Sequence, residues 1–148
     1  MEDSQKPWSD LASSSLLLKA VASWRADPEE WLEGAFDRLP ETVRVNPLRR
    51  DSAWVEQWLK DVGAQRIEWF IGPGSAGEMP FTRGSAEGEV RELLKSLHET
   101  GRITRQELVS MIPVLAMDIA PGELVLDMCA SPGSKTTQIA ECLGDSGI

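Results

Sequence analysis

The stretch that decides the fold is Leu124-Val125-Leu126-Asp127-Met128-Cys129-Ala130-Ser131-Pro132-Gly133-Ser134-Lys135-Thr136-Thr137. Its apolar start, residues 124–126, is typical of a buried strand, and the Pro132-Gly133 turn lets the backbone approach a ligand closely. From Ser134 onward the sequence predicts a helix, whose first backbone N–H groups lack partners within the helix. Such a helix start suits a carboxylate or a phosphate group.

Two common phosphate-binding motifs do not fit this stretch. A P-loop needs the pattern G-x-x-x-x-G-K-[ST], but Lys135 follows Ser134 rather than a glycine. The dinucleotide fingerprint G-x-G-x-x-G also fails, because Gly133 is the only glycine of the turn. A nucleoside triphosphate or NAD is therefore not the expected ligand.

Three segments resemble RNA cytosine-5 methyltransferases of the Sun/NSUN type. Residues 127–136 resemble the S-adenosylmethionine motif D-x-C-A-[AS]-P-G-[GS]-K-T, the most specific of the three. Residues 101–113 are similar to the segment that precedes this motif in the tRNA-modifying branch. Arg44-Val45-Asn46-Pro47-Leu48-Arg49 resembles the R-x-N-x-x-R element of the family's N-terminal domain. The matches stand in the family's order and cover nearly all of the chain beyond about residue 25.

The resemblance implies an α/β protein with a small RRM-like N-terminal α/β domain, followed by the start of a class I (Rossmann-like) methyltransferase domain. We expect the chain to hold only the first βα unit of that second domain. The expected division is a helical and RRM-like substrate-positioning domain at 1–71, a loop or linker at 72–88, and the start of the methyltransferase domain at 89–148. S-Adenosyl-L-methionine is the implied cofactor, and its implied contacts are Cys129, Ala130, Ser131, Pro132, Gly133, Ser134 and Lys135.

No catalytic residue is expected within this chain. Methylation of cytosine at carbon 5 needs a cysteine thiolate that attacks carbon 6 of the ring. In the resembled family this cysteine follows proline or threonine downstream of the cofactor motif, whereas Cys129 follows methionine and Cys142 follows glutamate. We therefore expect the chain by itself to be inactive, with Cys129 a small buried residue under the cofactor. Asp127 is expected to order the turn, and Lys135 suits a ligand contact and a solvated position equally well.

Arg44, Asn46 and Arg49 are the candidates for RNA contact, to phosphates or to a flipped base. The alternative is that these arginines pair with nearby carboxylates such as Glu41 and Asp51. The net charge of −9 argues against nucleic acid, although basic residues gather locally around this element. The expected partner is RNA, with tRNA the first candidate.

The periodicity of apolar residues and the positions of capping residues, glycine and proline predict the remaining helices and strands. The predicted helices cover about 10–24, a segment starting at Asp27-Pro28, 52–62, and 90 to about 101, with a capping box at 104–107 opening another. The predicted strands lie around 42–45 and 67–71, and 72–88 is predicted to be a long surface loop. Most of the six tryptophans are expected in the core rather than in base stacking.

Composition limits the other classes of function. No membrane span or signal peptide is visible, so a cytoplasmic protein is expected. Two cysteines and one histidine predict neither a metal site nor a disulfide framework, and the oligomeric state stays open. Two alternative functions remain, a non-catalytic RNA- or protein-binding fragment and a small-molecule methyltransferase.

Overall fold

The structure, a computed structural model, describes residues 15–35 and 37–148. The chain divides into two compact units, Met1–Arg38 and Leu39–Ile148. The boundary predicted around residues 72–88 therefore lies inside the second unit.

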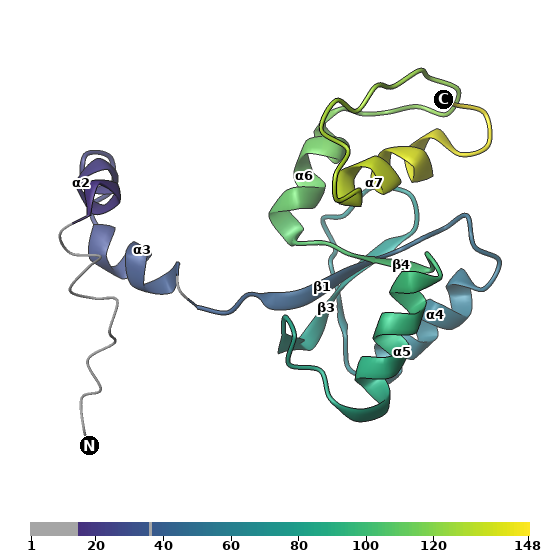
Figure 1. The fold of residues 1–148 in the computed structure, drawn as a ribbon, viewed down its shortest axis with the longest axis horizontal. Helices are drawn as coiled ribbons and strands as arrows, with labels where there is room; N and C mark the ends of the chain where they lie inside the picture. The colour runs from purple at the N-terminus through teal and green to yellow at the C-terminus, as the bar shows by residue number, and fades with distance from the viewer. Residues whose placement is uncertain (1–14, 36) are drawn as a thin grey trace. The chain divides into compact units, whose positions relative to one another are not determined.

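The first unit contains helices α2 (Leu16–Ala22) and α3 (Pro28–Gly34) (Figure 1). Pro28 occupies the first position of α3 as predicted, because its fixed φ angle suits a helix start. Asp27 precedes it but makes no capping hydrogen bond, since Arg25 donates to both oxygens of its carboxylate. The first residues of the helix predicted from about residue 10 lie outside the described residues.

The second unit is built on a four-stranded antiparallel sheet. Its strands are β1 (Pro40–Val45), β2 (Gln65–Arg66), β3 (Ser75–Thr82) and β4 (Ile103–Arg105), in the order β2-β3-β1-β4. Helix α4 (Ser52–Asp61) connects β1 to β2, and α5 (Gly88–Glu99) connects β3 to β4. This β-α-β-β-α-β order is the split β-α-β arrangement, which confirms the α/β class.

Each face of the sheet is covered by a different pair of helices (Figure 1). Alternate residues of β1 point to opposite faces. Val43 and Val45 face α4 and α5, and the core there consists of Val43, Val45, Val55, Leu59, Met79, Leu94, Leu97 and Ile103. On the other face α6 (Leu108–Ala116) buries Met111 against Ala76, and α7 (Ser134–Leu143) packs on α6 through Ile139.

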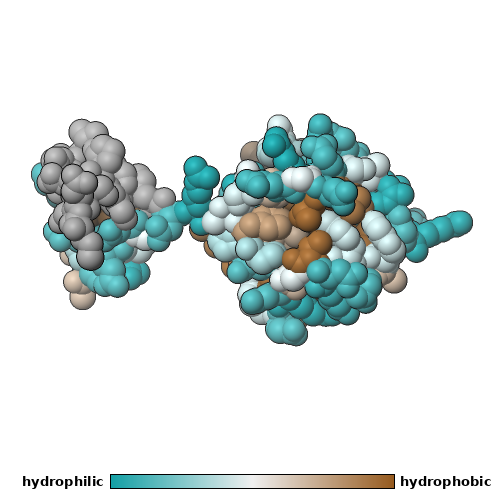
Figure 2. All heavy atoms as spheres, turned by 90° about the horizontal axis from the view of Figure 1, so that it is seen from below, coloured by the Kyte–Doolittle hydropathy of each residue, from teal (hydrophilic) through white to brown (hydrophobic). Residues whose placement is uncertain are grey.

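The outer surface on the side of α4 and α5 is mostly hydrophilic, with a few apolar residues among polar ones (Figure 2). Trp54 of α4 is exposed, as are Trp24 and Trp69, whereas Trp58 packs against the core. The expectation that most tryptophans are core residues is therefore wrong for these three exposed side chains.

The segment 65–88 differs from the prediction. The predicted strand at 67–71 is a turn, in which Ile67 and Phe70 are buried while Ile71 is exposed. The predicted loop or linker at 72–88 contains β3, which lies inside the sheet between β2 and β1. Small residues let β3 fit between its neighbours without giving a hydrophobic alternation, and this is why the sequence reads as a loop.

Two other predicted elements have a different form. Residues 104 and 105 of the predicted capping box belong to β4, and α6 begins at Leu108 without a side-chain cap. The strand predicted at the start of the ligand stretch is not formed, because residues 124–127 have no regular structure and Met128 begins a turn, and Leu124, Leu126 and Met128 are exposed. The Val125 N–H donates to the Ile148 carbonyl oxygen, and the Ile148 N–H donates to the Glu123 carbonyl oxygen.

Candidate functional site

The predicted ligand turn lies between residues 124–127 and α7. Asp127 orders the turn as predicted, because its carboxylate accepts hydrogen bonds from the Cys129 backbone N–H (2.9 Å) and the Thr136 hydroxyl (2.6 Å). These two donors, together with the charge of Lys135, hold the pKa of Asp127 below its ordinary value. One ionised side chain therefore ties the beginning of the turn to the first turn of the helix.

Gly133 precedes α7 in a left-handed conformation, with φ of 106°. This conformation favours glycine because a side chain would be strained there. The first backbone hydrogen bond of α7 runs from the Thr137 N–H to the Gly133 carbonyl oxygen, at 2.8 Å. The N–H groups of residues 134–136 precede that bond, so they are free of intrahelical partners and suit an anionic group.

The seven predicted cofactor residues lie together in this turn. Gly133 and Ser134 are half-buried, and the other five are exposed. Cys129 is therefore not the small buried residue expected at this position. Lys135 has an internal partner, because its ammonium group donates to the Ser110 hydroxyl of α6 at 3.0 Å.

The two cysteines differ in their surroundings. Cys142 of α7 packs against the apolar cluster of α6 and α7. Burial, followed by the nearby carboxylate of Glu141, raises the pKa of the Cys142 thiol and keeps it protonated at neutral pH. Cys129 belongs to the turn itself. Among the described residues no cluster of three or more metal-ligating side chains occurs.

The RNA candidates separate into one buried and two loop residues. The prediction that Arg44 contacts RNA is wrong for this structure, because its side chain is 0% exposed and bonded to Glu141 of α7. The Asn46 side chain donates to the Gly101 carbonyl oxygen and accepts from the Leu48 N–H, so it orders the loop after β1. Arg49 is exposed and makes one long hydrogen bond to the same carbonyl oxygen, at 3.4 Å.

The expected carboxylates pair with other arginines. Glu41 binds Arg105 of β4, and Asp51 binds Arg102. Both partners come from the segment around β4, which the sheet brings beside β1. Arg44 is therefore ion-paired, as the alternative predicts, but its partner is Glu141 rather than Glu41 or Asp51.

The larger groove of the site connects the turn to the sheet. It has a volume of about 410 Å³ and runs between β4 and the start of α7, with Pro132, Gly133 and Ser134 on one side. Arg83 and Arg105 line the other side, and each is paired with a glutamate, Glu107 and Glu41 respectively. Polar and apolar residues both line the groove, and it opens directly onto the ligand turn through residues 132–134.

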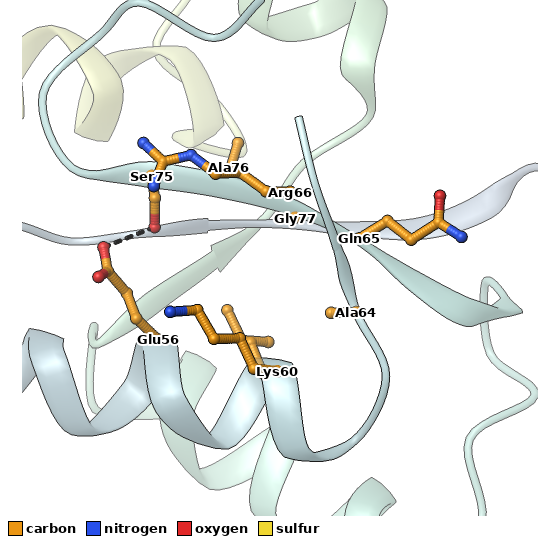
Figure 3. Close-up of a pocket in the computed structure, with 9 residues that line it drawn as sticks. Glu56, Lys60, Ala64, Gln65, Arg66, Ser75, Ala76 and Gly77 are labelled. Atoms are coloured by element: carbon orange, nitrogen blue, oxygen red, sulfur yellow. Dashed lines mark hydrogen bonds between the residues drawn. The ribbon is translucent and has the colours of Figure 1, made fainter. Parts of the chain in front are cut away.

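A second hollow lies at the opposite edge of the sheet, between α4 and the β2-β3 pair (Figure 3). The Ser75 hydroxyl donates to the Glu56 carboxylate across it, at 2.8 Å. Its volume of about 40 Å³ admits a few water molecules at most. This hollow is too small for a nucleotide or a cofactor, so the ligand turn and its groove remain the candidate site.

Sequence reasoning missed three residues of α7 that fix this site, namely Thr137, Gln138 and Glu141. All three bind residues of the sheet or of α6. The sequence does contain a signal for these three residues, because the polar residues at positions 134, 137, 138 and 141 share one face of the helix. On a helix that packs against the rest of the protein, a polar stripe of this kind indicates a polar contact with the fold.

The sequence of this chain is similar to parts of proteins named as RNA cytosine-5 methyltransferases. The chain is 32% identical to the tRNA (cytosine(49)-C(5))-methyltransferase of Pyrococcus abyssi over 122 residues, which cover 82% of this chain and 37% of that protein. It is 46% identical to the 26S rRNA (cytosine-C(5))-methyltransferase nsun-1 of Caenorhabditis elegans, over 80% of this chain and 17% of that protein. No protein-family profile matches.

A solved structure agrees with these relatives. The crystal structure of a methyltransferase homologue from Pyrococcus horikoshii superposes with a TM-score of 0.61 at 29% identity, covering 84% of this chain and 39% of that one. The chain spans between 6% and 37% of the length of the curated relatives that it matches. No helix among the described residues is long and apolar enough to cross a membrane.

Proposed function

We propose that this chain, which is related in sequence to RNA cytosine-5 methyltransferases of the Sun/NSUN type, combines the substrate-positioning domain of such an enzyme with its first cofactor-binding element. The observation that carries the proposal is the turn at 127–136, in which Asp127 binds both ends and leaves the start of α7 open. In this proposal the RRM-like domain is the split β-α-β unit at 40–105. The sequence predicts that domain at 1–71, which is earlier in the chain.

The turn fits S-adenosylmethionine by the chemistry of its donors. The methionine end of that molecule carries a carboxylate, which suits the unpaired N–H groups of residues 134–136 and the positive end of the α7 dipole. Gly133 has no side chain to obstruct the approach, and residues 129–135 would surround the group. When bound, S-adenosylmethionine supplies the methyl group of the reaction.

RNA is the proposed substrate, with tRNA the first candidate. Relatives named for tRNA and for rRNA support an RNA substrate. Arg49 is the member of the predicted basic set that stays exposed on the loop after β1, so we assign it the contact to a phosphate. The groove between β4 and the turn is large enough to bring a nucleotide beside the cofactor position. Because the chain has a net charge of −9, we expect RNA to contact only this local basic region. The affinity for RNA should fall as the salt concentration rises.

The chain alone is proposed to transfer no methyl group. Covalent catalysis at cytosine needs an accessible thiolate, and burial keeps the Cys142 thiol protonated. Cys129 lies where the cofactor is proposed to bind. Incubation of the purified chain with labelled S-adenosylmethionine and tRNA is expected to leave the RNA unlabelled, and label in the RNA above that of a heat-denatured control would contradict this.

Calorimetric titration of S-adenosylmethionine into the chain tests the proposed cofactor site. Gly133→Trp fills the turn and is expected to abolish binding, whereas Gly122→Trp is the matched control. Gly122 also has a left-handed conformation but lies in an earlier turn of the connection between α6 and α7. Binding that survives Gly133→Trp would place the cofactor elsewhere. Absence of binding by the unmodified chain, together with binding of tRNA, would favour a non-catalytic RNA-binding function.

A further inference from the structure

Arg44, the first residue of the R-x-N-x-x-R element at 44–49, is turned toward the inside of the protein. Arg44 lies on the face of β1 that α6 and α7 cover, and its guanidinium donates to both oxygens of Glu141, at 2.6 and 3.0 Å. It also donates to the Thr137 hydroxyl at 3.1 Å and to the side-chain oxygen of Gln106. A fully buried arginine therefore binds α7 at two successive turns.

Two glutamines extend this contact to α6. The Gln106 amide donates to the Gln138 side-chain oxygen at 3.1 Å and to the Ser110 carbonyl oxygen at 3.0 Å. The Gln138 amide donates to the Met111 carbonyl oxygen, at 3.1 Å. No buried side-chain nitrogen or oxygen among the described residues lacks a hydrogen-bond partner. The network is complete, and a complete buried network specifies one arrangement of its elements.

The contacts on α7 follow one stripe that begins at the ligand turn. The Ser134 carbonyl oxygen, Thr137 and Glu141 are spaced by three and four residues, so they lie on the same side of the helix. All three accept hydrogen bonds from Arg44. Fixing this stripe fixes the rotation of α7 about its axis, and with it the direction of the first-turn N–H groups.

We propose that Arg44 is a positioning residue for the cofactor site, which it fixes by holding α7 against β1 in one rotation. This inference rests on the proposed function, because it assigns the purpose of the contact to the turn at 127–136. Apolar side chains could join α7 to β1 with no loss of stability, since a buried ion pair often stabilises a fold little more than well-packed hydrophobic residues do. A planar guanidinium with several fixed donors adds direction, which apolar packing lacks.

The test separates position from stability. Arg44→Met/Glu141→Leu replaces the ion pair with an apolar pair, and Val55→Ala is the control, because Val55 is buried in the core on the other face of the sheet. The double variant is expected to melt near the unmodified chain. Amides of residues 137–141, which are hydrogen-bonded within α7, should exchange about tenfold faster while those of β1 and β3 keep their protection, and S-adenosylmethionine should bind about tenfold more weakly.

Val55→Ala is expected to melt at a lower temperature and to change neither α7 exchange nor affinity. Unchanged exchange in the double variant, or equal changes in Val55→Ala, would overturn the inference. If the double variant does not fold, Arg44→Lys decides by the same measurements, because lysine keeps the charge and loses the paired geometry. If the unmodified chain binds no S-adenosylmethionine, the proposed function fails, whereas the exchange comparison still decides the role of Arg44.

Discussion

The carboxylate of Asp127 accepts a 2.6 Å hydrogen bond from the hydroxyl of Thr136, nine positions later in the first turn of α7. The same carboxylate accepts the Cys129 N–H. The whole turn is thereby closed by one side chain that comes from outside the helix. Because Asp127 accepts both hydrogen bonds as an ionised carboxylate, the order of the turn depends on pH.

Acid is expected to loosen the turn only below the ordinary pKa of aspartate. The folded-state pKa of Asp127 is lowered, so its stabilising contribution is present above the unfolded value of 3.8 and is lost as the pH falls through the folded value. The chemical shift of the Cys129 amide, followed by NMR, should change with a midpoint below 3.8. In Asp127→Asn this transition should be absent. A midpoint at or above 3.8 in the unmodified chain would contradict the expectation.

Arg44→Met is expected to destabilise the second unit by about 3–5 kcal/mol, because it leaves the Glu141 carboxylate buried without its partner. Urea unfolding of the variant and of the unmodified chain measures the difference. A loss within the error of that measurement would mean that water or another group reaches Glu141.

The same variant should become sensitive to alkaline pH. Burial already raises the pKa of Glu141 against the effect of Arg44, so removing the guanidinium raises it further. An acid with a raised folded-state pKa contributes stability below its unfolded pKa and loses it as the pH rises through the folded value. Cys142 is the other titratable neighbour. Arg44→Met should therefore be less stable at pH 8 than at pH 5, and Arg44→Met/Glu141→Gln should lose most of that difference.

Gly74→Ala is expected to destabilise the sheet, and Gly84→Ala to do so much less. Both glycines have left-handed φ angles near 80°, so the conformational strain of the substitution is similar. A methyl group at Gly74 would lie 2.4 Å from the Val45 carbonyl oxygen, whereas at Gly84 it would meet nothing within 4 Å. Thermal melting of the two variants measures the difference. Equal melting temperatures would argue against the pairing of β3 with β1.

Met111→Ala is expected to cost about 2–5 kcal/mol, because it opens a cavity between the sheet and α6. Ile112→Ala is the matched control on the same helix, since the Ile112 side chain is 49% exposed. Chemical denaturation should show a clear loss for Met111→Ala and little for the control. A reversed order would mean that α6 presents a different face to the sheet.

Much of the local structure was predictable because its causes lie within a few residues. The helix start at Pro28, the strand around Val43 and the helix at 52–61 follow from a proline, an alternation and a helical period. The strand β3 was not predictable in this way. Its small residues, together with an internal proline, resemble a loop until β1 and β2 pair on its two sides.

The sequence by itself determined the ligand turn, because Asp127, Gly133 and Thr136 interact across less than ten residues and carry their chemistry in their order. Only the tertiary structure decided what Arg44 does. A strand alternation does not say whether a charged residue faces solvent or a covering helix, and the carboxylate that binds Arg44 lies 97 positions later. An arginine that looked like a contact for RNA is instead an internal contact, because the sheet and α7 close over it and Glu141 offsets its buried charge.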